Sequence, residues 1–436
     1  MKLLKFKGGV HPHDHKELSK SSQIVPVPPP EFVYVPLSQH TGAPSKPIVE
    51  KKAQVKKGTR LSEPVGFVSV PVHSPVSGTV MGIVPYYHPL GKKMDAIKIK
   101  VEGDEIEEGI GEERDYSNMK KEEMIEAIKM AGIVGLGGAA FPTHVKLSPP
   151  PDKPIDIVII NGAECEPYLT SDYRLMIERP DDIIKGTEII RRILNPKRVV
   201  IGIEDNKPDA IQILREKTDG TGIEVVSLPA RYPQGSEKQL IYAITGRKVP
   251  AGGLPFDVGC YVQNVGTAIA IYEALRFGKP LYERVVTITG GVNKPGNYLV
   301  PIGTPASHLI EQAGGVKGEV GKIIFGGPMM GLAQITDAVP VIKGTSGILI
   351  QLKNEVHIED VYPCIRCSSC VDVCPMGLIP NMIGKLVNAG KYEMAEEMGL
   401  MFCIECGCCA YVCPSKRPLV HTFKMGKREV LKRRKK

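Results

Sequence analysis

The sequence contains no tryptophan, few aromatic residues and no long apolar run. Aromatic residues make up 6% of its 436 residues and are not interleaved with the basic ones, so nothing here favours nucleic-acid recognition. No stretch approaches the ~18 apolar residues that a membrane-spanning helix needs. The first residues, Met-Lys-Leu-Leu-Lys, lack the apolar core of a secretory signal. We therefore expect neither an integral membrane protein nor a secreted one.

The composition that remains is that of a globular protein with a basic end. Hydrophobic residues make up 42% of the chain and charged residues 24%, which is ordinary for folded domains. The length allows three or four domains. Much of the net charge of +8 falls in the segment from Lys424 to Lys436. Such a tail could meet nucleic acid, anionic lipid or an acidic protein, or it could be a solvated disordered end.

Eight of the eleven cysteines repeat one spacing near the C-terminus. The two runs are Cys364-x2-Cys367-x2-Cys370-x3-Cys374-Pro375 and Cys403-x2-Cys406-x2-Cys409-x3-Cys413-Pro414. This spacing is typical of proteins that hold two [4Fe–4S] clusters. Three cysteines at x2 spacing can reach one cubane from a tight loop, whereas the fourth cannot bend back and ligates the other cluster.

The predicted ligand sets are therefore crossed between the runs. Cluster 1 takes Cys364, Cys367, Cys370 and Cys413, and cluster 2 takes Cys374, Cys403, Cys406 and Cys409. Structural zinc would leave the spacing and the following prolines unexplained. Disulfides are disfavoured because the chain has no secretory signal. Cys408 is out of phase with both runs, so we expect it to be a bystander.

The N-terminal part is predicted to be an extended arm followed by a small β domain. Residues 1–46 are rich in proline and contain His11, His13 and His15, which could bind a metal, although a solvated cluster is favoured. Residues 47–115 contain short β-type runs, and the sequence after Val55 resembles the barrel-sandwich hybrid of lipoyl and biotinyl domains. It lacks a carrier lysine at a hairpin tip. We expect a structural or docking module there. The runs are Gln54–Leu61, Val65–Val72, Gly78–Val84 and Ala96–Val101.

Four further segments complete the predicted multidomain α/β and α+β architecture. Strands and helices alternate over 116–280, which predicts a Rossmann-like α/β domain with its ligand at the carboxyl ends of the strands. Residues 281–355 suggest a β-grasp domain. A helical ferredoxin-like domain with two [4Fe–4S] clusters spans 356–420, and a basic tail spans 421–436. The expected parallel strands are Ile155–Ile160, Arg198–Ile203 and Ile223–Leu228.

A glycine-rich segment opens the α/β domain. Gly135, Gly137 and Gly138 lie within a few residues of Ala139 and Phe141, so the backbone can approach a phosphate or a flat ring closely. Lys146 ends the segment with a positive charge suited to a phosphate or a reduced flavin. A tight turn between packed elements is the simpler alternative.

A second polar segment follows the strand at Ile155–Ile160. Asn161 can contact a flavin edge, and Glu166 can hold ribose hydroxyls or a nicotinamide amide. Because it directly follows a strand, this segment lies at the sheet edge where α/β proteins bind ligands. Alternatively, Glu164 and Glu166 only cap the next helix.

Together these motifs resemble the flavin- and NADH-binding subunit of respiratory complex I. With the cysteine runs and the β-grasp segment, the whole chain resembles the C subunit family of Rnf electron-transport complexes. Ala163 and Ser236 depart from the complex I pattern. The resemblance implies FMN contacts for Gly135, Gly137, Gly138, Lys146, Asn161, Gly235, Glu237 and Asn264, and NADH contacts for Ala139, Phe141 and Glu166. Glu164 is a further candidate for cofactor binding.

The resemblance also implies an activity and partners. We expect an NAD-linked oxidoreductase, one of the subunits of an ion-translocating ferredoxin:NAD+ oxidoreductase, with Lys146 and Glu166 at the reacting centre. Its expected cofactors are two [4Fe–4S] clusters, FMN and NAD(H). Its partners are the membrane-integral subunits and the ferredoxin-like B subunit, which hold it on the cytoplasmic side of the cell membrane. The alternatives are a flavin- and cluster-containing cobalamin reductase of bacterial microcompartments and a non-catalytic polyferredoxin scaffold.

Overall fold

A four-stranded parallel sheet forms the centre of the α/β domain in the computed structural model, which describes residues 5–357 and 359–434. Its strand order is β10-β9-β8-β11. The first three strands in the chain confirm the prediction, whereas β11 was not predicted because only five residues form it. The strands are β8 (Ile157–Gly162), β9 (Arg198–Glu204), β10 (Ile223–Leu228) and β11 (Cys260–Asn264).

Helices cover both faces of this sheet. Val158 and Ile160 pack into the larger core, while Ile157 and Ile159 pack on the opposite face against α6. Because both faces are buried, the strands are almost continuously β-branched, which made them recognisable. Helices α2, α3 and α6 were not predicted. The helices are α1 (Lys121–Met130), α2 (Thr143–Lys146), α3 (Ser171–Glu178), α4 (Pro180–Leu194), α5 (Pro208–Thr218), α6 (Glu237–Thr245) and α7 (Val265–Phe277).

The barrel-sandwich domain begins earlier than predicted. Strand β2 comes from the segment expected to be an extended arm, yet it pairs with β7 in the barrel sheet. The predicted strand Val65–Val72 is wrong. That segment is irregular, and its apolar residues Val70 and Val72 are buried without strand pairing. The strands are β2 (Phe32–Pro36), β3 (Lys46–Pro47), β4 (Gln54–Val55), β5 (Ser62–Glu63), β6 (Gly78–His88) and β7 (Lys92–Val101).

The β-grasp domain is a six-stranded mixed sheet with one helix. Its order is β1-β13-β12-β16-β14-β15, so the arm also contributes β1 to this sheet. Strand β16 lies in the centre of the sheet, although the sequence did not indicate it. The elements are β1 (Ile24–Pro26), β12 (Glu283–Gly290), β13 (Gly296–Pro301), α8 (Ala306–Gln312), β14 (Val320–Phe325), β15 (Leu332–Gln334) and β16 (Gly347–Leu352).

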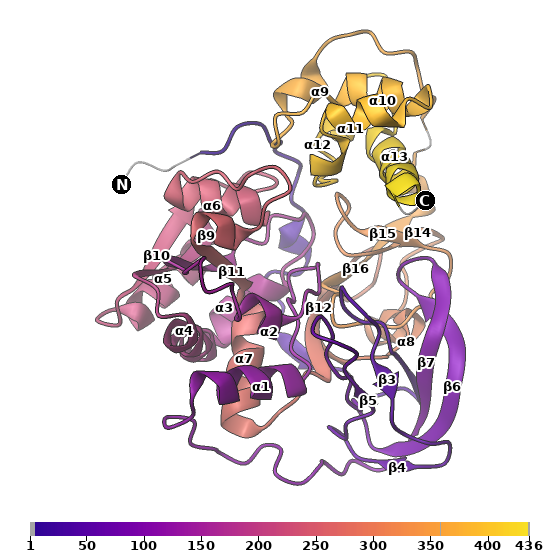
Figure 1. Cartoon of the computed structure of the whole chain (residues 1–436). Helices are drawn as coiled ribbons and strands as arrows, with labels where there is room; N and C mark the ends of the chain where they lie inside the picture. Colours follow the sequence, from indigo (N-terminus) through magenta and orange to yellow (C-terminus); the bar gives the residue numbers. More distant parts are fainter. Residues whose placement is uncertain (1–4, 358, 435–436) are drawn as a thin grey trace.

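The cysteine-rich domain lies at one end of the molecule, next to the α/β and β-grasp domains (Figure 1). Its last helix, α13, packs on α10 and α11 through Phe423 and Val430. Residues 424–434, for which a solvated disordered end was one alternative, are therefore helical, and the boundary predicted at 420 falls inside this helix. Residues 435 and 436 lie outside the described part. The helices are α9 (Ser369–Asp372), α10 (Pro380–Asn388), α11 (Tyr392–Glu397), α12 (Cys408–Tyr411) and α13 (Leu419–Arg434).

The contact between α4 and α7 yields a test of the core. A Cβ atom added at Gly186 would lie 1.9 Å from the carbonyl oxygen of Ala268, which is backbone and cannot rotate away. Alanine favours a helix over glycine by ~1 kcal/mol, but overpacking costs about 1–3 kcal/mol. Gly186→Ala should therefore lower the thermal unfolding midpoint, measured by circular dichroism. Gly318→Ala, where the nearest atom is 3.9 Å away, is the matched control. Equal midpoints for the two variants would contradict this packing.

Candidate functional site

The two cysteine runs enclose two separate cavities. Each cavity contains the four cysteines that the spacing assigned to one cluster, three from one run and the last from the other. The first is lined by Cys364, Cys367, Cys370 and Cys413. The second is lined by Cys374, Cys403, Cys406 and Cys409. Four thiols around one hollow are the donor set that a cubane needs.

The backbone repeats the same turn in both runs. Arg366 and Ser368 adopt left-handed conformations, with φ of 57° and 63°, and Glu405 and Gly407 do so at the equivalent positions, with φ of 59° and 82°. Such alternation curls a loop so that its N–H groups point inward. The N–H of Glu405 accordingly donates to the sulfur of Cys403 over 3.3 Å. Hydrogen bonds of this kind tune a cluster potential.

Cys408 is not an isolated bystander. It is fully buried and lines the second cavity beside Cys406 and Cys409. It also packs against Val10 and Tyr232, which belong to other domains. Cys165 packs against this same group, and burial raises the pKa of its thiol. Cys260 is buried on β11, and burial raises its pKa as well.

The carboxyl ends of β8 and β11 bring two predicted asparagines together. Asn161 and Asn264 lie opposite each other in the sheet register. Asn161 Nδ2 donates to the carbonyl of Gly235 over 2.8 Å. Asn264 Oδ1 accepts from Gly266 N at 2.9 Å and so caps α7. Both side chains fix the loops that border this edge of the sheet.

The glycine-rich loop lies against the same edge. A Cβ atom at Gly137 would lie 3.5 Å from Asn264, whereas one at Gly138 would meet nothing within 4 Å. The peptide before Gly137 is held from both sides. Leu136 N donates to Thr267 Oγ1 over 2.9 Å, and its carbonyl accepts from the buried Arg284 over 3.3 Å. The loop is therefore a fixed surface with little side-chain bulk.

Lys146 supplies the positive charge at this surface. Its Nζ lies 3.3 Å from a carboxylate oxygen of Glu237 and 2.5 Å from the carbonyl oxygen of Val262. It also lies over the ring of Tyr261, 5.4 Å from the ring centre. The buried Tyr261 hydroxyl and Gln234 Nε2 have no hydrogen-bond partner within residues 5–357 and 359–434. A lysine that follows a glycine-rich loop with little side-chain bulk fits a phosphate-bearing flavin.

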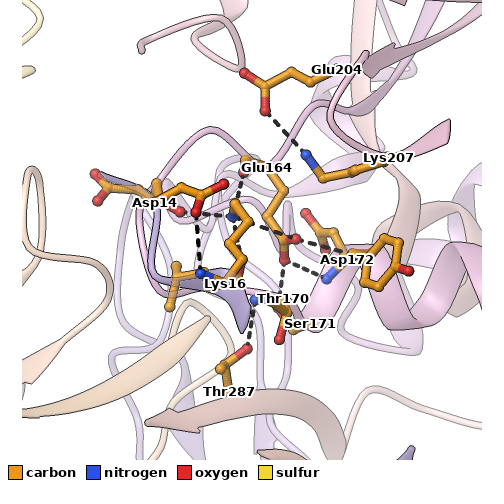
Figure 2. A network of polar contacts seen from close by, with 12 residues as sticks. Asp14, Lys16, Glu164, Thr170, Ser171, Asp172, Glu204, Lys207 and Thr287 are labelled. Atoms are coloured by element: carbon orange, nitrogen blue, oxygen red, sulfur yellow. Dashed lines mark hydrogen bonds and ion pairs between the residues drawn. The ribbon is translucent and has the colours of Figure 1, made fainter. Parts of the chain in front are cut away.

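The loop after β8 does not place both glutamates at this surface. The carboxylate of Glu164 accepts from Asp172 N at 2.7 Å and Tyr173 N at 3.2 Å, so it caps α3 (Figure 2). That is the alternative noted from the sequence. Ala139 and Phe141 lie on the glycine-rich loop itself, where the carbonyl of Phe141 accepts from Gly135 N.

Glu166 lies where three domains meet. Its carboxylate accepts from Met329 N at 3.2 Å and Met330 N at 2.9 Å, both in the β-grasp domain. The hydroxyl of Tyr232 lies 3.4 Å away and also donates to the carbonyl of Cys406 over 2.7 Å. Burial raises the pKa of Glu166 to about 7. No sequence pattern points to Tyr232, because its partners are distant in the chain.

The histidine-rich arm lies close to this loop. Ligand atoms of His13, His15 and Glu17 come within 4.8 Å of one another. His13 and Glu17 are exposed, and the ring of His15 stacks on Tyr168 with ring centres 4.4 Å apart.

Four family models match successive parts of the chain. Residues 4–104 match the RnfC barrel sandwich hybrid domain and 128–273 the Nuo51 FMN-binding domain. Residues 285–333 match the SLBB domain and 357–414 a 4Fe-4S dicluster domain. Together they define the class of multidomain flavin and iron–sulfur proteins, and they confirm the predicted fold class and the predicted FMN and [4Fe–4S] cofactors.

Relatives over nearly the whole chain give the family. The C subunit of the proton-translocating ferredoxin:NAD(+) oxidoreductase complex of Clostridium ljungdahlii is 49% identical over 91% of this chain and 87% of its own. The C subunit of the Na(+)-translocating complex of Acetobacterium woodii is 45% identical over 99% and 98%. The C subunit of the ion-translocating oxidoreductase complex of Rhodobacter capsulatus is 40% identical over 98% and 83%. The chain belongs to the family of C subunits of ion-translocating ferredoxin:NAD(+) oxidoreductase complexes, as the resemblance predicted.

A solved structure shares the fold. A chain of an NAD+-reducing [NiFe]-hydrogenase in the H2-reduced state aligns with a TM-score of 0.51 and 18% identity. The alignment covers 71% of this chain and 62% of the hydrogenase chain, so this protein spans less than two thirds of that relative. Among the residues that the structure describes, no helix has the length and apolar character to cross a membrane.

The crossed cavities predict how single cysteine variants behave. Cys413→Ala removes a ligand from the cavity formed by Cys364, Cys367 and Cys370, so about four of roughly eight irons should be lost or poorly bound. Cys408→Ala, which changes a non-ligand thiol lining the other cavity, should retain all of them. Iron analysis and EPR of anaerobically purified protein check this. Retention of two intact clusters in Cys413→Ala would contradict the crossed assignment.

The buried carboxyl of Glu166 predicts a pH dependence of stability. Because its pKa is raised to about 7, the folded protein holds this proton more tightly than the unfolded chain. The contribution of Glu166 to the free energy of unfolding is fully present below the pKa that this carboxyl has in the unfolded chain. It is lost as the pH rises through about 7. Glu166→Gln stays neutral, so its thermal midpoint relative to the unmodified chain should rise between about pH 5 and pH 8. Unfolding scans under nitrogen measure this, and a constant difference would exclude the raised pKa.

Proposed function

We propose that this chain exchanges hydride with NAD(H) at a bound FMN and passes single electrons through two [4Fe–4S] clusters, as part of a membrane-associated, ion-translocating complex. The observation that carries the proposal is the physical connection between the flavin-binding domain and the second cysteine cavity through Tyr232. A hydride carries two electrons, whereas a cubane accepts one, and a flavin handles both.

The residues at the sheet edge have distinct proposed roles. Gly135, Gly137 and Gly138 form the floor on which a flavin lies. Lys146 neutralises negative charge on it, whether on its phosphate or its reduced ring. Asn161, Gly235, Glu237 and Asn264 hold the bordering loops in place, as their hydrogen bonds suggest.

The proposed nucleotide contacts come from the glycine-rich loop and from the loop after β8. Ala139 and Phe141 would line the approach for NAD(H), and Glu166 would accept hydrogen bonds from it. Glu164, which caps α3, would act on the nucleotide only through the loop that it holds.

The two cavities differ in their surroundings, which supports an order of electron transfer. The second cavity borders the α/β domain. Tyr232 donates to Cys406, and Gln239 donates to the carbonyl of Pro375 over 3.2 Å. In the first cavity Cys364 and Cys367 are exposed, and the neighbouring Ile365 is 67% exposed. Cluster 2 would therefore exchange electrons with the flavin, and cluster 1 with the next carrier.

That carrier would belong to another protein of the complex. The relatives are named as subunits of complexes, which supports assembly with further subunits. We include the ferredoxin-like B subunit and membrane-integral subunits among them. The chain would then be held on the cytoplasmic face of the membrane through these partners, with no nucleic acid involved.

The proposal is tested by the response of the full, anaerobically purified chain to NADH. NADH should bleach the flavin absorbance and support reduction of an artificial acceptor. Lys146→Met should retain about eight irons but lose bound FMN by on the order of tenfold, because the cation at the glycine floor is gone. Lys153→Met is the control, since this half-exposed lysine pairs with Asp257 away from the floor.

Two results would overturn the proposal. An unmodified chain that holds no flavin and does not respond to NADH would be a cluster scaffold. FMN content equal in Lys146→Met and Lys153→Met would remove Lys146 from the site.

A further inference from the structure

One buried lysine of the N-terminal arm contacts the loop that contains Glu166. Lys16 lies in the short turn Lys16–Leu18, is 6% exposed, and lies beside Glu164 under the start of α3 (Figure 2). Its Nζ donates to the carbonyl oxygens of Glu164 at 2.9 Å, Glu166 at 3.0 Å and Leu169 at 2.5 Å. An ammonium has three donor hydrogens. All three are therefore used on one loop.

The loop would not hold this shape without help. Glu164 and Tyr168 have left-handed backbones, with φ of 50° and 68°, which only the surroundings can maintain in residues other than glycine. Three carbonyl oxygens converge on one point, where they would repel one another without a cation. Lys16 supplies that cation, and Glu164 Oε2 lies 4.0 Å from the same nitrogen.

Further contacts join the arm to the same loop. Tyr168 N donates to the carbonyl of Asp14 over 2.6 Å, and Ser19 Oγ lies 2.8 Å from Thr170 Oγ1. Thr170 and Ser19 then bond to Asn297 of the β-grasp domain. The arm therefore clamps the loop between two domains, with Lys16 in the middle of the clamp.

Lys16 acts on Glu166 through the backbone. The carbonyl of Glu166 is held by Lys16 on one side, and its carboxylate is held by Met329 N and Met330 N on the other. We propose that Lys16 is a positioning residue, which sets where the Glu166 carboxylate lies and thereby the affinity for the nicotinamide nucleotide. This rests on the proposed function of the site.

The experiment compares two variants of Lys16 with a control variant, and a double variant with Glu166→Ala alone, all in the full chain with clusters and flavin bound. Lys16→Met keeps the length of the side chain and removes the three donors. Lys16→Arg keeps the charge but spreads its donors over a plane, so it cannot serve three converging carbonyls from one atom. Lys20→Met, an exposed lysine of the same arm, is the control.

The expected result is a change in KM with little change in kcat. Lys16→Met should raise the NADH concentration for half-maximal reduction by on the order of tenfold, and Lys16→Arg should raise it by about threefold. The FMN content, the iron content and the rate at saturating NADH should stay close to those of Lys20→Met. The double variant Lys16→Met with Glu166→Ala should be no worse than Glu166→Ala alone, because Lys16 acts through that carboxylate.

The outcomes separate the two proposals. If the unmodified chain does not react with NADH, the proposed function fails. In a second outcome, the unmodified chain reacts with NADH, and Lys16→Arg with full cofactors needs the same NADH concentration for half-maximal reduction as Lys20→Met. The positioning role of Lys16 then fails, while the proposed function stands. Additive effects in the double variant would also overturn the positioning role. If Lys16→Met does not fold, Lys16→Arg alone decides the question.

Discussion

The hydrogen bonds of Tyr232 connect the α/β domain to the cysteine-rich domain. Its hydroxyl donates to the carbonyl of Cys406 and lies close to the carboxylate of Glu166. One side of this contact is the sheet edge that fits a flavin, and the other is the loop that lines the second cavity. Because Met329 also packs here, the β-grasp domain closes the contact from a third side. The redox centres can therefore lie close together only if all three domains keep this arrangement.

Buried cations hold that arrangement. Lys343 is fully buried and donates to the carbonyls of Pro71 and Gly132, which belong to two other domains. Burial lowers its pKa to about 7. Arg284 donates to Leu136 from the β-grasp side, and Lys16 joins the arm to the loop after β8. Each cation satisfies carbonyl oxygens at an interface, where unpaired backbone groups would be costly.

The parts that were predictable from the sequence are those with a local signal. The spacing of the cysteine runs predicts which four thiols line each cavity, and the β-branched runs mark β8, β9 and β10. The loop Gly135–Lys146 is recognisable because several glycines close together in the sequence indicate a backbone that a ligand can approach closely. For Glu164 the sequence left two interpretations open, and the hydrogen bonds to Asp172 and Tyr173 show the helix cap.

What the sequence could not show depends on contacts between distant residues. Lys16 meets its acceptors about 150 positions away, and a single lysine in a proline-rich arm has no pattern that points to them. Tyr232 and Arg284 are hidden for the same reason. Strand β11 is too short to be periodic, and β2 was missed because the prolines around it suggested an extended arm instead of a paired strand.

The exchange of the fourth cysteine between the runs has a consequence for biogenesis. Neither half of the motif is a complete scaffold, since a lone first run would lack Cys413 and a lone second run would lack Cys374. With the proposed ligand sets, metal insertion would need both loops, and it would finish only after the chain up to residue 413 has been synthesised. Loss of the cluster proposed for the more exposed first cavity would free Cys413, which belongs to the same run as Cys403, Cys406 and Cys409 of the second cavity.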